Sequence, residues 1–198
     1  MKGEIKMKKY ISILLTLIMV LTFAVACSPK NSPNDDVNPP SENPEDSGNN
    51  EDEEDVPTES KEVTLYFANK KYADTADESL EKLIGEKRNI KYSDISLEEA
   101  IIAELMKGPE DEDNLYTEIP PTAKLIDVKV EDSLASVNFA SEGMNGGSMQ
   151  EAFTINQIVA SLLELDNIDK VQFLLDGEKT ESLMGHYGID QPFDEVTF

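Results

Sequence analysis

Hydrophobic residues recur along this chain with different periods, and each change of period marks an expected element. Five strand-forming residues in succession at 63–67 predict a buried β-strand. Between residues 80 and 90 the pattern fits both a helical turn and a strand. Arg88, Ile90 and Tyr92 then alternate with polar residues, so we expect extended structure around these three positions.

The first clear helix follows. Ser96 and Glu99 have the spacing of a capping box, and apolar residues then recur at helical spacing. Gly108 followed by Pro109 predicts the end of this helix, with the glycine as a left-handed cap. The acidic run 110–113 is expected to be a solvated loop.

A β-hairpin is expected next, because residues 124–130 and 134–139 alternate and the short polar segment 131–133 separates them. After a glycine-rich loop, Ser148 and Glu151 have the spacing of a second capping box. The helix that they begin is apolar around most of its circumference, which indicates burial under a sheet.

The final elements are a strand at 171–175, a turn at Asp176-Gly177 and an irregular last segment. Together the elements predict an α+β fold, a single compact domain with a mixed or antiparallel sheet packed on two helices.

The start of the chain has the plan of an export signal. Lysines near the start precede an apolar run at 11–20, which is too short for a good membrane span. Small residues then lead to Cys27, the only cysteine. An ordinary secretory signal leaves Cys27 unexplained, and the other readings of a lone cysteine are an intermolecular disulfide or a free thiol.

The sequence before Cys27 resembles a lipobox. We therefore predict a lipoprotein signal peptide at 1–26, with lipid on Cys27 anchoring the chain at the outer face of the cytoplasmic membrane. Met7 would serve as a start as well as Met1. Residues 27–60 carry many Pro, Asn, Asp and Glu and no aromatic residue, so we expect a disordered acidic linker there. The folded domain is expected at 61–198.

The charge balance excludes nucleic-acid binding. The chain has 41 acidic and 17 basic residues, a net charge of −24, which repels phosphate backbones. Like surfaces also repel each other, so we expect a monomer at low ionic strength. Assembly is expected only with added salt, divalent cations or a basic partner.

No residue pattern predicts catalysis, a metal site or a cofactor. His186 is the only histidine, and no nucleophile or metal ligand is paired with it in the sequence. Asp111 and Asp113 resemble the start of a calcium loop, but Leu115 and Tyr116 break the ligand pattern. The alternative is a cell-wall glycan hydrolase using paired carboxylates, suggested only by export and acidity.

Several short segments, in order, resemble the GerMN domain family of spore-germination proteins. They lie at 63–67, 86–88, 104–109, 119–125, 135–141, 158–162 and 171–178. The resemblance implies a compact α+β fold similar to ring-building motifs. It also implies binding of envelope or sporulation proteins, or of wall material, in sporulation, germination or the cell envelope. It carries over no catalytic residue. The protein that gives the family its name has two such domains in tandem, whereas this chain has length for one.

Arg88 is the only arginine and stands among acidic neighbours. Two roles are open for it. One is internal, as a salt bridge or a cap on a helix C-terminus; the other is contact with a carboxylate of a partner.

The lipid anchor gives a direct test. Cys27→Ser should leave an unprocessed precursor or release a soluble form, and metabolic labelling with palmitate should be lost. Labelling and processing that persist in the Cys27→Ser chain would contradict the lipoprotein prediction.

Overall fold

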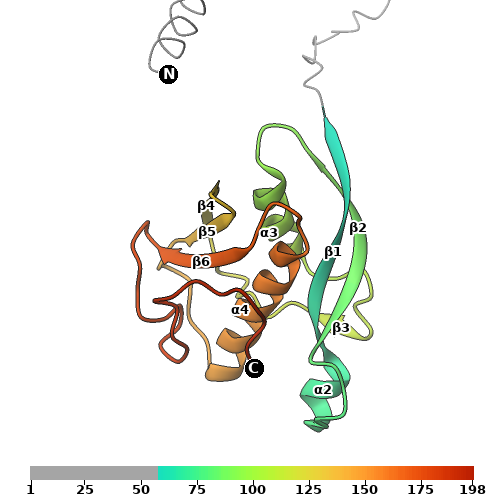
Figure 1. Ribbon diagram of the computed structural model, residues 1–198. Coiled ribbons are helices and arrows are strands. Elements are labelled where there is room, and N and C mark those ends of the chain that lie inside the picture. Colours follow the sequence, from blue (N-terminus) through green and yellow to red (C-terminus); the bar gives the residue numbers. More distant parts are fainter. Residues whose placement is uncertain (1–57) are drawn as a thin grey trace, which may run out of the picture. The chain divides into compact units, whose positions relative to one another are not determined.

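The computed structural model describes residues 58–198 (Figure 1). The expectations for the signal peptide, for Cys27 and for nearly all of the linker lie outside the described residues. Within them, no helix is long and apolar enough to cross a bilayer.

The first sheet is built on a long antiparallel ribbon. It consists of β1 (Glu59–Asn69), β2 (Leu83–Tyr92) and the two-residue β3 (Leu115–Tyr116), in the order β2-β1-β3. The short helix α2 (Lys70–Thr75) lies in the connection between β1 and β2. The mixed pattern at 80–90 therefore resolves mainly into a strand, which confirms the extended structure expected around Arg88.

The second sheet contains β4 (Leu125–Glu131), β5 (Leu134–Phe139) and β6 (Lys170–Leu175), in that order. β4 and β5 form the expected hairpin. Its turn residues Asp132 and Ser133 both have positive φ, 49° and 62°, which is typical of the tight hairpin turn. β6 runs parallel to β5, so the chain must cross over between them, and helix α4 (Ser148–Leu163) makes this crossover.

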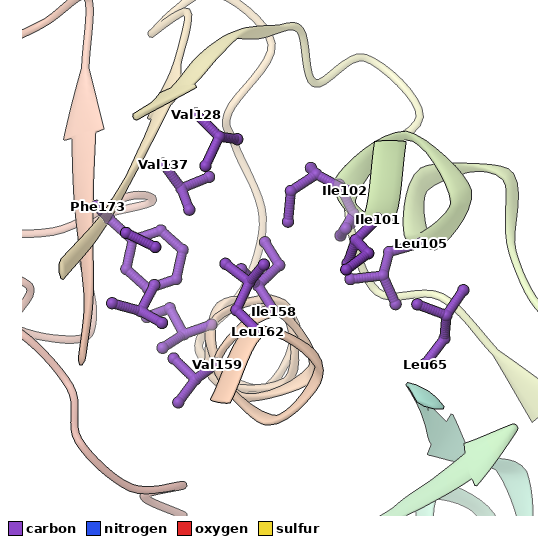
Figure 2. Close-up of a cluster of buried hydrophobic side chains, with 14 of the residues drawn as sticks. Leu65, Ile101, Ile102, Leu105, Val128, Val137, Ile158, Val159, Leu162 and Phe173 are labelled. Carbon is purple, nitrogen blue, oxygen red and sulfur yellow. The ribbon is translucent and has the colours of Figure 1, made fainter. Parts of the chain in front are cut away.

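The hydrophobic core lies between the two sheets. Figure 2 shows α4 with Val128, Val137 and Phe173 of the second sheet on one side, and side chains of α3 (Leu97–Lys107) and β1 on the other. The α+β class is confirmed, and the one sheet that we expected is divided into two. The core residues of the described part of the chain fall between Val63 and Ile189, within one compact unit.

Helix α3 begins as predicted and ends differently. Ser96 Oγ accepts from the N–H of Glu99, and the Glu99 carboxylate accepts from the N–H of Ser96, both at 3.1 Å. Gly108 has φ 97° and ψ 176°, which is open to glycine but is not left-handed helical. The predicted left-handed cap is therefore wrong.

The second predicted capping box is also wrong. The N-cap of α4 is Gly147, and no side chain caps it. Glu151 is fully buried, and its carboxylate accepts from the backbone N–H groups of Met184 and His186, each at 2.8 Å. These N–H groups belong to a loop packed against the helix and need a buried acceptor, so they take the carboxylate that the cap would have used.

Four more polar side chains of α4 are buried, and each hydrogen-bonds to the backbone of a segment packed against the helix. Thr154 and Gln157 bind Glu118, Ser161 binds Tyr66, and Asn156 binds Thr197. The helix thus fixes the surrounding chain through polar groups as well as through apolar contacts.

Glu151→Gln tests this role of a buried carboxylate. The oxygen of the substituted glutamine amide can accept from one of the two backbone N–H groups, but its own N–H₂ then faces the other. We therefore expect the free energy of unfolding to fall by about 2 kcal/mol in urea titrations. Glu142→Gln is the matched control, because Glu142 is exposed and pairs only with Lys124; it should leave stability unchanged. Equal stability of the two variants would contradict the assignment.

Candidate functional site

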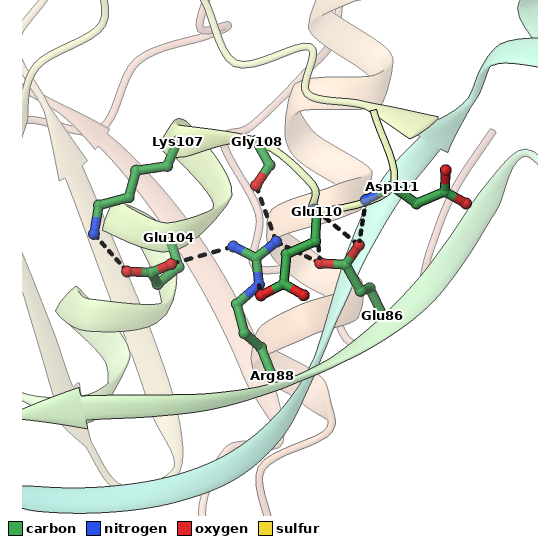
Figure 3. Close-up of polar contacts among 7 residues, drawn as sticks. All are labelled: Glu86, Arg88, Glu104, Lys107, Gly108, Glu110 and Asp111. Carbon is green, nitrogen blue, oxygen red and sulfur yellow. Dashed lines mark hydrogen bonds and ion pairs between the residues drawn. The ribbon is translucent and has the colours of Figure 1, made fainter. Parts of the chain in front are cut away.

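Arg88 lies on the inner face of the first sheet. The β1–β2 register places it opposite Val63, whose side chain is buried, so both point toward α3. Its guanidinium pairs with Glu86 and with Glu104 at 3.1 Å, and donates to the carbonyl of Gly108 at 3.1 Å (Figure 3). One side chain thus joins strand β2 to the C-terminal end of α3.

The surroundings of Arg88 leave little of it accessible. Its side chain is 11% exposed, and the guanidinium carbon stands 5.5 Å from the centre of the Phe67 ring. Nε is buried without a hydrogen bond, with the Glu110 carboxylate 3.9 Å away. Arg88 therefore serves as both an internal ion-pair partner and the cap of α3. Its contact with a partner carboxylate stays a prediction.

The two carboxyls beside Arg88 are held in the ionised form. Partial burial alone would raise the pKa of Glu86, but hydrogen bonds from Arg88 and from the backbone N–H groups of Glu110 and Asp111 outweigh it, so the pKa is lowered. For Glu104, burial is likewise outweighed by bonds from Lys107 and Arg88, and its pKa is also lowered.

The acidic loop after α3 is attached through its backbone. The N–H groups of Glu110 and Asp111 donate to Glu86 at 3.0 and 3.2 Å, and the Asp111 carboxylate accepts from the side chain of Asn114. Among residues 58–198, no group of three or more His, Cys, Asp or Glu side chains is arranged to hold a metal ion.

His186 lies in the loop that Glu151 fixes. Its Nε2 stands 3.2 Å from the carbonyl oxygen of Gly146, and its backbone N–H binds Glu151. These contacts join two loops and place no nucleophile beside the imidazole.

An open groove of about 480 Å³ lies between the β1–β2 ribbon, α4 and the last segment of the chain. Its apolar lining comes from Leu83, Ala160, Leu163, Val196 and Phe198. Glu81, Lys82, Glu164 and Tyr66 stand around it, and the Tyr66 hydroxyl donates to Glu164 at 2.9 Å.

Sequence reasoning did not find the groove. The residues that line it come from four separate segments, and no local pattern unites them.

Comparison with known proteins decides the family. Residues 64–181, more than half of the chain, match the Germane family, which is described as "Sporulation and spore germination". The chain belongs to the Germane family. The resemblance to the GerMN domain drawn from the sequence is confirmed.

Solved structures agree on the fold. The tandem GerMN domains of the sporulation protein GerM from Bacillus subtilis match at 20% identity and a TM-score of 0.53, covering 69% of this chain and 46% of that one. The first GerMN domain of the same protein matches at 17% identity and 0.51, covering 69% and 97%.

A candidate lipoprotein from Clostridium perfringens matches at 25% identity and a TM-score of 0.47, covering 68% and 87%. No curated protein matches the chain.

Arg88→Met tests the ion-pair node of this Germane domain. Removing the cation takes the guanidinium from two largely buried carboxylates, and leaves Glu86 with backbone N–H groups and Glu104 with Lys107 alone, so the free energy of unfolding should fall by about 2 kcal/mol at pH 7. The carboxyls have lowered pKa values in the folded chain, so their contribution is present above their ordinary value of 4.5 and is lost as pH falls. The difference from the parent chain should therefore shrink below pH 4.5.

Lys87→Met is the control for Arg88→Met. Lys87 is the adjacent residue on β2, and its only ion pair within residues 58–198, with Glu62, is on the surface. Its stability should match that of the parent chain throughout the urea and pH series. A loss in Arg88→Met that does not change with pH would contradict the role assigned to Glu86 and Glu104.

Proposed function

We propose that this chain is a lipid-anchored extracytoplasmic protein whose GerMN domain is a non-catalytic interaction module. The family description supports a role in sporulation or germination, and a role in cell-envelope assembly fits the same location. The anchor is Cys27, which holds the domain at the outer face of the cytoplasmic membrane through the linker.

The observation that carries this proposal is the open groove beside α4. It presents apolar side chains to solvent in a chain with a net charge of −24. An apolar surface bordered by polar groups is typical of a site that binds another molecule. The partners are other envelope or sporulation proteins.

The pKa shifts of the partly buried glutamates support binding over glycan hydrolysis. Such hydrolases need one carboxyl with a raised pKa as the general acid. Glu86 and Glu104, which the structure brings together, both have lowered pKa values. Burial raises the pKa of Glu118, but this carboxyl is bonded to the Tyr116 hydroxyl and does not line the groove.

Purified residues 58–198 incubated with peptidoglycan separate the two functions. A binding module releases no soluble muropeptides, and the same protein used as bait should retain a defined partner from envelope fractions. Muropeptide release that a single substitution such as Glu164→Gln or Glu81→Gln abolishes would overturn the proposal in favour of the hydrolase.

A further inference from the structure

The segment 194–198 is held against α4 by one buried amide. The Asn156 side chain is 1% exposed; its Nδ2 donates to the carbonyl of Thr197 and its Oδ1 accepts from the N–H of Thr197, both at 2.6 Å. The amide therefore binds the peptide unit as a neighbouring β-strand would, through one donor and one acceptor. Such recognition reads the backbone and is independent of the side chain at that position.

The next residue places an aromatic ring beside the groove. The centre of the Phe198 ring is 4.9 Å from that of Phe153, and Lys82 Nζ stands 5.2 Å from it on the β1–β2 side. Val196 and Phe198 also form one wall of the groove, and Figure 1 shows this end of the chain beside α4.

This segment is weakly held compared with the others that α4 binds. All residues from 194 to 198 are exposed, and Phe198, despite its ring contacts, is 46% exposed. Within residues 58–198, neither Asp194 nor Glu195 forms an ion pair. Both lie on a domain with a large excess of acidic residues, so their charges oppose docking.

We propose that residues 194–198 occupy a docking site for a short segment of a partner protein. The segment places an aromatic or large apolar residue at the position of Phe198 and basic residues at the positions of Asp194 and Glu195. This inference deepens the proposed binding function and rests on it.

Three contacts define what binds. Asn156 binds the backbone of one residue, Phe153 with Lys82 receives the ring, and the acidic domain favours basic side chains. A basic segment keeps the first two contacts that the chain's own segment makes and replaces repulsion by attraction. It therefore displaces residues 194–198 and extends into the groove beside them.

The probes are two synthetic peptides. One has the sequence of residues 193–198, and the other carries Asp194→Lys and Glu195→Lys. The receptor is the domain ending at Phe193, which keeps the backbone bridge between Phe193 and Val171. Fluorescence anisotropy should show binding of both peptides, with the basic peptide tighter by about tenfold at low salt and the gap closing as salt rises.

Two controls make the site specific. Asn156→Ala in the shortened domain removes the amide that has lost its Thr197 partner there and keeps only the carbonyl of Ala152, and should weaken both peptides by at least about tenfold. The unshortened domain should bind the basic peptide more weakly than the shortened one, because its own segment competes. If the shortened domain does not fold by circular dichroism, the full 58–198 domain with Thr197→Pro and Phe198→Ala replaces it as receptor.

Failure to bind either peptide, or equal binding with and without Asn156, would overturn the docking site. If envelope partners are still retained in that case, the binding function stands and only the docking site is lost. Dimers formed by exchange of this segment would show as a concentration-dependent mass in ultracentrifugation of the unshortened domain. That result would assign the site to a second copy of the chain and would overturn the partner proposed here.

Discussion

The structure depends on the burial of helix α4, whose residues from Glu151 to Val159 are all buried. A polar side chain removed from water on such a helix needs a hydrogen-bond partner, because an unpaired one costs a large share of the stability of a small domain. α4 carries five such side chains within its apolar surface. Each takes the backbone of a loop or strand edge as its partner, so segments with no secondary structure of their own acquire fixed positions.

The ion pairs around Arg88 also fix neighbouring segments, here through charged groups. Arg88 points inward from β2 and meets the open end of α3, where helix carbonyls lack partners. The carboxylates of Glu86 and Glu104 compensate its charge. Glu86 also accepts hydrogen bonds from backbone N–H groups of the acidic loop, and so attaches this loop to β2. In a chain so rich in acid, a single arginine therefore organises several carboxylates that would otherwise repel one another.

Local signals in the sequence were enough for most of the elements. Runs and alternation of apolar residues located the strands, including the extended structure around Arg88, and the Ser96–Glu99 box located the start of α3. The errors share one cause, which is competition from residues distant in the sequence. Glu151 had the spacing of a cap, but its carboxylate binds the backbone of the loop around His186 instead. The division of the sheet and the groove depend on how separate segments meet, and no local pattern records that.

The parallel pairing of β5 and β6 has a consequence for how the chain reaches this structure. A polypeptide is synthesised from its N-terminal side, and the β1–β2 and β4–β5 ribbons can each form from neighbouring residues. β6 can join its sheet only after the crossover helix has been synthesised, because its contacts with β5 join residues far apart in the chain. Until then the side chains of Val137 and Phe139, which are buried in the folded chain, are open to water, and the chain is most exposed to proteolysis before residue 170 arrives.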